Sequence, residues 1–235
     1  MVAALKYLVV PAAVKQTATV IFIHGLGDSG LGWKPVADMF RRDPALAHVK
    51  WVLPHAPVGP VTANMGMSMP TWFDIYSFGF SGAEDKDGMI KSSGLINELI
   101  EQEIKDGIDP GRIVLAGFSQ GGAMTLLTGL TSRHKISGLA VLSGWLPIRT
   151  HVKEILAPHV ASLPIFWGHG SNDPLVKPML AQMSKDFLTK ECGISMAQPG
   201  DTKGLSFNMY SGVEHSTNNQ ELLDLSNFLK KVVPA

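Results

Sequence analysis

Short apolar segments alternate with longer segments of mixed polarity along most of this chain. Seven of the short segments are almost entirely apolar, and several are rich in β-branched or aromatic residues. This pattern is typical of strands that are covered on both faces of a sheet. The predicted strands are Lys6–Val10, Thr19–His24, Trp51–Leu53, Arg112–Phe118, Gly138–Ser143, Pro164–Gly168 and Ser206–Tyr210.

Apolar residues recur at helical spacing between these strands and after the last one. The first such segment, Lys91–Asp106, has Ser92 and Ser93 as candidate caps and Gly107 as a stop signal. The other predicted helices are Gln120–Leu130, Met179–Lys190 and Gln220–Val233. Because strands alternate with helices, we expect an α/β fold with a mostly parallel central sheet, right-handed crossovers and helices on both faces.

The segment 55–90 interrupts this alternation. It is rich in Gly and Pro, and a loop of this length inside a compact domain is usually functional or disordered. It is too apolar for disorder, because it contains Met65, Met67, Met69, Trp72, Phe73, Tyr76, Phe78 and Phe80. We interpret it as an irregular insertion that forms part of a groove for a flexible acyl chain, with irregular core packing as the alternative.

Length and charge limit the class of protein. The chain has 235 residues, of which 45% are hydrophobic, and it shows neither a repeat nor a linker, so we expect a single domain over residues 1–235. Twenty basic and twenty acidic residues give a formal net charge of zero. Since no basic block stands out, a nucleic-acid partner is not expected.

The expected location is the cytoplasm. A single cysteine, Cys192, excludes an intramolecular disulfide framework and is typical of a reducing compartment. The apolar N-terminal run contains Lys6 and ends at Pro11, which favours a strand over a signal peptide. No apolar run approaches the ~20 residues of a membrane span.

The most informative motif is Gly117-Phe118-Ser119-Gln120-Gly121, which has the pattern G-x-S-x-G. An apolar strand leads into it and a helix-compatible run follows, which is the context of a nucleophile elbow. Glycines at 117 and 121 suit a tight turn where side chains would meet neighbouring backbone. The alternative is an ordinary glycine-rich loop before a helix.

A nucleophilic serine needs a base and an acid, which in this arrangement follow it in the order acid, then histidine. Asp173 comes just after the predicted strand Pro164–Gly168, whereas Asp201 lies in a polar loop. Of the eight histidines, only His215 follows the last strand and precedes the final helix. We therefore predict that His215 takes the proton of Ser119 and that Asp173 orients His215.

Backbone N–H groups must also stabilise the charge that develops on the substrate carbonyl oxygen. We expect these donors to be the N–H of Gln120, directly after the serine, and the N–H of Leu26, in the glycine-rich loop after Thr19–His24. The glycines of that loop also match a G-x-G-x-x-G dinucleotide motif. Asp28 would crowd a pyrophosphate there, and no acidic residue ends a second strand some 20 positions on, so the oxyanion interpretation is preferred.

The chain resembles the acyl-protein thioesterase/lysophospholipase family of small α/β-hydrolases. Further blocks that carry this resemblance are Pro54-His55-Ala56-Pro57, Met69-Pro70-Thr71-Trp72-Phe73-Asp74, Ser143-Gly144-Trp145-Leu146-Pro147 and His215-Ser216. They span nearly the whole chain, and the Met-Pro-x-Trp-Phe-Asp and Trp-Leu-Pro blocks are the most specific. Two positions depart from some relatives: Val2 stands where some animal members have a palmitoylated cysteine, and Gly144 where some have cysteine.

The resemblance implies a cytosolic serine hydrolase that cleaves long-chain acyl thioesters of protein cysteines, without a metal or organic cofactor. It implies that Asp28 helps to hold the oxyanion loop. The residues expected to contact the acyl chain are Leu31, Trp33, Met65, Met69, Trp72, Phe73 and Leu175.

Several alternatives stay open from the sequence. The enzyme could be a lysophospholipase or general carboxylesterase that acts on oxygen esters, or a non-catalytic binder that retains the fold. A nucleotide-binding oxidoreductase is disfavoured, because Asp28 in the loop after Thr19–His24 would crowd a pyrophosphate. We expect a monomer or weak homodimer with at most transient contact with a membrane surface.

Overall fold

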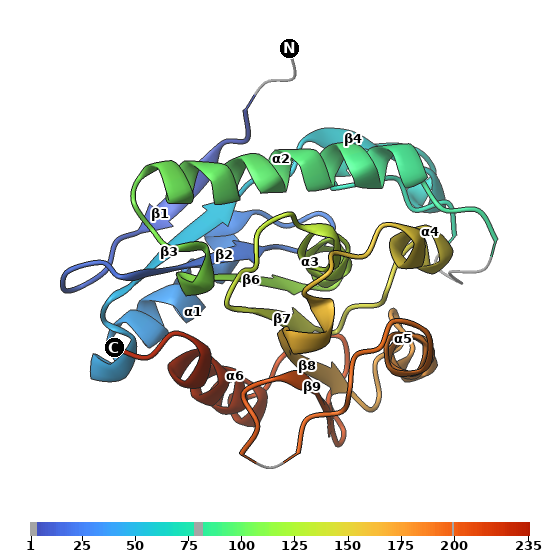
Figure 1. Cartoon of the computed structure of the whole chain (residues 1–235). Coiled ribbons are helices and arrows are strands. Elements are labelled where there is room, and N and C mark those ends of the chain that lie inside the picture. Colours follow the sequence, from blue (N-terminus) through green and yellow to red (C-terminus); the bar gives the residue numbers. More distant parts are fainter. Residues whose placement is uncertain (1–3, 78–81, 199) are drawn as a thin grey trace.

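A seven-stranded sheet forms the centre of the computed structural model, which describes residues 4–77, 82–198 and 200–235 (Figure 1). In spatial order its strands are β1 (Tyr7–Val10), β3 (Val49–Pro54), β2 (Ala18–Ile23), β6 (Ile113–Phe118), β7 (Gly138–Leu142), β8 (Pro164–Gly170) and β9 (Gly204–Tyr210). Only β1 runs antiparallel to its neighbour among these strands. The predicted mostly parallel sheet is confirmed, and each predicted strand lies within a few residues of the observed one.

Helices cover both faces of this sheet, as predicted. One face is covered by α1 (Gly30–Arg41) and α6 (Asn219–Val232), and the other by α2 (Lys86–Lys105), α3 (Gln120–Thr131), α4 (Arg149–Glu154) and α5 (Pro178–Glu191). Short 3-10 turns occur at Pro44–Leu46, Thr62–Asn64, Pro110–Arg112 and Val160–Ser162. Alternate strand residues enter two different cores: Phe22 packs under α1, whereas Ile23 packs on the side of α2 and α3. None of the helices in the described residues is long and apolar enough to cross a membrane.

The helices differ from expectation in three places. Helix α1 was not predicted, because Gly30, Gly32 and Pro35 disfavour a helix locally, yet Ala37 and Phe40 are buried against the sheet. Tertiary packing of this face outweighs the low propensity. The short helix α4 was also not predicted.

Helix α2 begins five residues earlier than predicted. Its N-cap is Asp85, whose carboxylate accepts a hydrogen bond from the Gly88 N–H. Ser92 and Ser93 are therefore not caps: both are buried inside the helix, where Ser92 Oγ donates to the Trp72 carbonyl oxygen and Ser93 Oγ accepts from Thr128 Oγ1.

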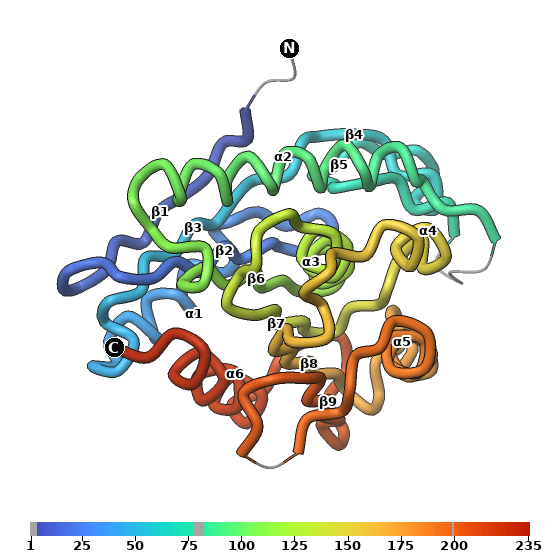
Figure 2. The backbone as a smooth tube through the Cα atoms, in the orientation of Figure 1, coloured from blue at the N-terminus to red at the C-terminus, as the bar shows by residue number. Residues whose placement is uncertain are grey.

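The segment 55–90 is more regular than the predicted insertion. It contains an antiparallel hairpin of β4 (Val58–Val61) and β5 (Met67–Pro70), which forms a separate two-stranded sheet at the periphery (Figure 2). The hairpin turns at Met65 and Gly66, which both have positive φ. Two residues of the predicted groove, Phe78 and Phe80, lie outside the described part of the chain.

Four strands end at the same edge of the central sheet. Because β2, β6, β8 and β9 are parallel, the loops that follow them meet there. These loops carry the glycine-rich loop after β2, Ser119, Asp173 and His215. The fold thus brings together residues that are nearly 200 positions apart.

Candidate active site

Ser119 occupies a strained turn between β6 and α3. Its φ of 56° and ψ of −119° are rarely adopted by a residue with a side chain. A side chain at Gly117 would collide with the Gly121 carbonyl and Thr125, and one at Gly121 with the Ile23 and His24 carbonyls. The predicted need for glycine on both sides of the serine is therefore confirmed.

His215 lies between Ser119 and Asp173. Its Nε2 is 2.8 Å from Ser119 Oγ, and its Nδ1 is 2.7 Å from Asp173 Oδ2. A carboxylate can only accept, so Nδ1 carries the proton and Nε2 is free to accept the hydrogen of the serine hydroxyl. This is the tautomer that a general base needs.

The carboxylate of Asp173 is buried and fully engaged. Oδ1 accepts the N–H groups of Leu175 and Val176, each at 2.9 Å, while Oδ2 faces His215. Burial pushes the pKa of Asp173 upward, but the bond to His215 and the two backbone N–H groups outweigh it and keep the pKa below its usual value. Asp173 therefore stays ionised beside the imidazole.

The two predicted oxyanion donors follow neighbouring strands. Leu26 lines the same cavity as Ser119 and His215, in the loop after β2. Gln120 is the first residue of α3, where its N–H has no earlier helical carbonyl to bond with. Asp28 also lines this cavity, and its carboxylate fills the space that a side chain at Gly32 would occupy.

His24 supports this loop in a way that sequence reasoning missed. The Ala56 N–H donates to its Nε2 at 3.0 Å, so Nδ1 carries the proton and donates to the Gly25 carbonyl oxygen at 2.7 Å. Burial is the main reason why its pKa lies below the usual value. A histidine directly before the glycine-rich loop was the available signal.

His169 was also passed over. It is fully buried, its Nε2 donates to the Val176 carbonyl oxygen at 2.8 Å, and burial lowers its pKa. A neutral His169 thus braces the turn that holds Asp173. Its position on the strand end before Asp173 was the available signal.

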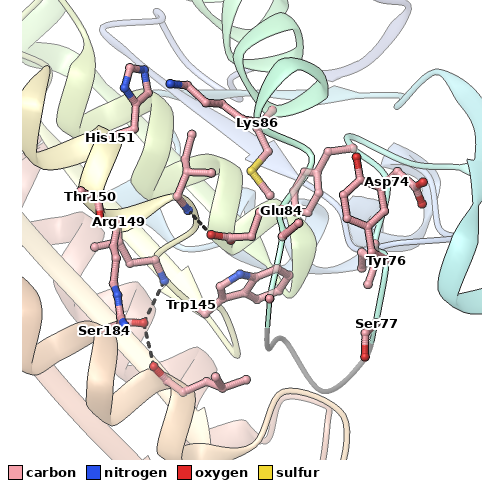
Figure 3. A pocket seen from close by; sticks show the side chains of 18 of the residues that line it. Asp74, Tyr76, Ser77, Glu84, Lys86, Trp145, Arg149, Thr150, His151 and Ser184 are labelled. Carbon is pink, nitrogen blue, oxygen red and sulfur yellow. Dashed lines mark hydrogen bonds between the residues drawn. The ribbon is translucent and has the colours of Figure 1, made fainter.

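Two neighbouring cavities lie in this part of the protein, and the smaller one borders the serine. The smaller, about 250 Å³, adjoins Ser119 and His215. The larger, about 620 Å³, extends between the start of α2, α4 and α5 (Figure 3). Both are bordered by Ile75 and Trp145, which therefore lie between the two cavities.

The larger cavity is lined by both apolar and polar side chains. Phe73, Met89, Leu146 and Leu180 contribute apolar surface. On the wall, the Glu84 carboxylate accepts the Ile148 N–H at 2.9 Å, and burial raises the pKa of Glu84 (Figure 3). The volume of the larger cavity lies within the range of small-molecule sites, about 300–1,000 Å³.

The residues predicted to contact an acyl chain are dispersed. Leu175 borders the cavity at Ser119, and Phe73 borders the larger one. Leu31 and Met65 are exposed at the surface, and Met69 is partly buried against the core beside Gly27.

Two predicted contacts serve the core instead. Trp33 stacks on Phe22 with ring centroids 4.1 Å apart, and Trp72 is only 2% exposed. Neither borders one of these two cavities, and their contact with an acyl chain stays a prediction. Ile75 and Trp145, which border both cavities, were missed because they come from segments that only the fold brings together.

No cluster of three or more His, Cys, Asp or Glu side chains suited to a metal ion occurs in residues 4–77, 82–198 and 200–235. The buried thiol of Cys192 lies at the end of α5, and burial raises its pKa.

Comparisons with known proteins agree with this geometry. The family model described as Phospholipase/Carboxylesterase matches residues 5–233. Acyl-protein thioesterase 1 of Mycosarcoma maydis is 45% identical over 243 residues, covering 98% of both chains, and that of Cryptococcus neoformans var. neoformans is 43% identical, covering 97% of this chain and 98% of the relative.

Solved structures show the same fold. Arabidopsis thaliana SOBER1 superimposes with a TM-score of 0.83 at 32% identity, covering 92% of this chain and 99% of the other. Zea mays acyl-protein thioesterase 2 gives a TM-score of 0.83 at 25% identity, covering 97% and 99%. With a matching family model over nearly its whole length and an α/β-hydrolase fold, the chain belongs to the phospholipase/carboxylesterase family.

Proposed function

We propose that this protein is a serine hydrolase that removes long-chain acyl groups from protein cysteines through an acyl-enzyme on Ser119. The observation that carries the proposal is the continuous hydrogen-bonded chain from Ser119 through His215 to Asp173, at the mouth of an apolar cavity. Acyl-protein thioesterase relatives of similar length support the thioester as the bond that is cleaved.

Acylation follows from the tautomer of His215. Ser119 Oγ attacks the thioester carbonyl carbon while Nε2 of His215 takes the hydroxyl proton, and Asp173 stabilises the imidazolium that forms. The carbonyl oxygen becomes an oxyanion, which the N–H groups of Leu26 and Gln120 stabilise; one such donor is typically worth about 3–4 kcal/mol of barrier. The C–S bond then breaks, and His215 returns the proton to the departing cysteine thiolate.

Deacylation repeats these roles with water. His215 removes a proton from a water molecule, whose oxygen attacks the acyl carbon of the Ser119 ester. The second tetrahedral intermediate collapses, His215 protonates Ser119 Oγ, and the fatty acid leaves. The protein's own residues suffice for every one of these proton transfers.

The acyl chain is proposed to run from Ser119 past Ile75 and Trp145 into the larger cavity. The shared border of the two cavities at these residues supports this path, as do the apolar side chains of Phe73, Met89 and Leu180 beyond it. In this proposal the segment 55–90 contributes the wall through Phe73 and Ile75, within a single domain over residues 1–235.

The proposed setting is the cytoplasm, where the protein acts as a monomer or weak homodimer. Leu31, Met65 and Leu175 are 61%, 88% and 52% exposed, and these apolar side chains support transient contact with a membrane surface that carries acylated proteins.

A fluorophosphonate probe tests the nucleophile. We expect the wild-type protein to form one covalent adduct, located on Ser119 by peptide mass spectrometry, and the Ser119→Ala variant to form none and to lose at least about 10⁴-fold in kcat. Adducts that persist in Ser119→Ala would move the nucleophile elsewhere, and an unlabelled, folded wild type would refute the hydrolase.

A matched substrate series tests the leaving group. The same acyl lengths are presented as thioesters and as oxygen esters, and kcat/KM is compared. We expect long-chain thioesters to be preferred, because a thiolate of pKa about 8.5 leaves more readily than an alkoxide. A consistent preference for oxygen esters would replace the thioesterase with the carboxylesterase or lysophospholipase that the family also includes.

A further inference from the structure

The two proposed oxyanion donors are held by different parts of the fold. Leu26 belongs to the loop after β2, whereas Gln120 opens α3 after β6. An oxyanion hole works only if its donors are fixed at the separation that the tetrahedral intermediate requires. A structural connection between the two is therefore expected, and the segment Pro70–Phe73, which begins at the last residue of β5, contacts both donor loops.

On one side, the side chain of Gln120 binds this segment. It is fully buried: Oε1 accepts the Trp72 N–H at 2.9 Å, and Nε2 donates to the Phe73 carbonyl oxygen at 2.8 Å and to Thr71 Oγ1 at 3.0 Å. The Thr71 hydroxyl in turn donates to the same Phe73 carbonyl oxygen at 2.6 Å. Both polar groups of the side-chain amide therefore form a hydrogen bond with the backbone.

On the other side, the segment binds the β2 loop at two points that flank Leu26. Trp72 Nε1 donates to the His24 carbonyl oxygen at 2.9 Å, and the Gly27 N–H donates to the Pro70 carbonyl oxygen at 2.9 Å. Ser92 of α2 also binds the segment, because its hydroxyl donates a hydrogen bond to the Trp72 carbonyl oxygen. Four consecutive residues therefore connect both donor loops to each other.

We infer that Pro70–Phe73 and the Gln120 side chain form a brace that sets the distance between the N–H groups of Leu26 and Gln120. Trp72, Thr71 and the Gln120 side chain are positioning residues, which act on the transition state through the backbone and do not contact the substrate. This inference rests on the proposed acyl transfer at Ser119. It also gives the buried Trp72 a role that its assignment as a groove wall did not.

The test removes the side-chain hydrogen bonds of the brace one residue at a time. Trp72→Phe deletes the indole N–H and keeps a large ring, and Thr71→Val deletes the hydroxyl at nearly constant volume. The matched control is Trp51→Phe, because Trp51 is also buried but its indole N–H has no hydrogen-bond partner within the described residues. Folding of each variant is checked by its thermal midpoint.

Three readouts separate positioning from binding. With a short-chain ester, we expect Trp72→Phe to lower kcat by about 10–100-fold with KM within twofold, since a displacement near 1 Å can cost about 10²-fold. The loss of kcat should be smaller for Thr71→Val, and the kcat and KM of Trp51→Phe should equal those of the wild type. The inhibition constant of a trifluoromethyl ketone, which forms a tetrahedral oxyanion adduct with a serine, should rise in proportion to the loss of kcat/KM. The Kd of an alkyl ether of equal length, which lacks a carbonyl, should stay constant.

Two results would overturn the brace. The first is that the kcat and KM of Trp72→Phe and Thr71→Val equal those of Trp51→Phe. The other is a loss that appears in KM and in ether binding but not in trifluoromethyl ketone affinity. Fluorophosphonate labelling and turnover of the wild type are measured in parallel, so failure of the hydrolase itself is seen independently of the variants.

Discussion

The reaction centre and the larger cavity are built in different ways. At the reaction centre, Ser119, Asp173 and His215 each follow a strand of one parallel sheet, and hydrogen bonds of 2.7–2.9 Å hold each side chain. The larger cavity has no such frame: its walls come from the segment after β5, the start of α2, α4 and α5. Hydrogen bonds from the N–H groups of Ile148, Leu146 and Asp74 to the side chains of Glu84, Ser184 and Asp85 join these loops and helices to one another.

This difference separates chemistry from substrate choice. Proton transfer between a serine and a histidine tolerates little displacement, so the side chains involved are best placed on rigid strand ends. A flexible acyl chain requires apolar volume but no exact contact, so loops and helix faces suffice. Substitutions at the two places should therefore change different kinetic properties.

The largest effect is expected at the reaction centre. Asp173→Asn should lower kcat by about 10⁴-fold, because an amide in place of the carboxylate no longer holds Nδ1–H of His215 and favours the wrong tautomer. The loss should be the same for short and long acyl chains, as measured by steady-state kinetics. Asp201→Asn is the control, since Asp201 is exposed in a loop and its carboxylate accepts the Gln198 N–H. Similar losses in both variants would contradict the assignment of Asp173.

A smaller and selective effect is expected where the two cavities meet. Ile75→Phe should narrow the junction and lower kcat/KM for long-chain substrates by about tenfold or more, and leave the shortest esters within about threefold. The measurement is kcat/KM across acyl lengths, with thermal midpoints to detect overpacking. Ile90→Phe on the exposed face of α2 serves as the control. An equal loss at every chain length would remove the distinction between the two regions.

The smallest effect is expected away from both regions, beneath strand β8. It should change the free energy of unfolding and not the kinetics. Glu221 of α6 is fully buried against Gly168 of β8; neither carboxylate oxygen has a partner among the described residues, and burial raises its pKa to about 8. Between pH 6.5 and 8 the folded protein therefore holds a proton that the unfolded chain has released, so stability falls as pH rises, by up to ~1.4 kcal/mol per pH unit.

Glu221→Gln should flatten this slope and be more stable than the wild type at pH 8, as measured by urea unfolding. Burial also lowers the pKa values of His24, His169 and His159, and these groups oppose the slope up to about pH 7.5, where histidines of the unfolded chain still lose protons. Both proteins contain these histidines, so their contribution cancels in the difference between Glu221→Gln and the wild type. Glu98→Gln, on the exposed side of α2, should leave the slope unchanged. A difference in stability between Glu221→Gln and the wild type that stays constant from pH 6.5 to 8 would contradict a protonated Glu221.

Local sequence signals predicted the elements whose surroundings are uniform. The apolar strands are recognisable because both faces of the sheet are buried, and Ser119, Asp173 and His215 could be located from chain order at strand ends. Helix α1 could not, because its Gly and Pro residues oppose a helix until Ala37 and Phe40 pack on the sheet. The hairpin of β4 and β5 was missed because its strands pair with each other at the periphery and lack a continuous apolar pattern.

By itself, the sequence determined the α/β class, the parallel sheet and the placing of Ser119, Asp173 and His215 at successive strand ends, because these depend on periodicity and on what directly follows each strand. Only the tertiary structure decided which residues border the larger cavity, that Trp72 is buried behind the glycine-rich loop after β2, and that the Gln120 side chain binds backbone groups 47 and 48 positions away. Such contacts join segments distant in sequence, and their partners are chosen by three-dimensional packing, which leaves no periodic signal in either segment.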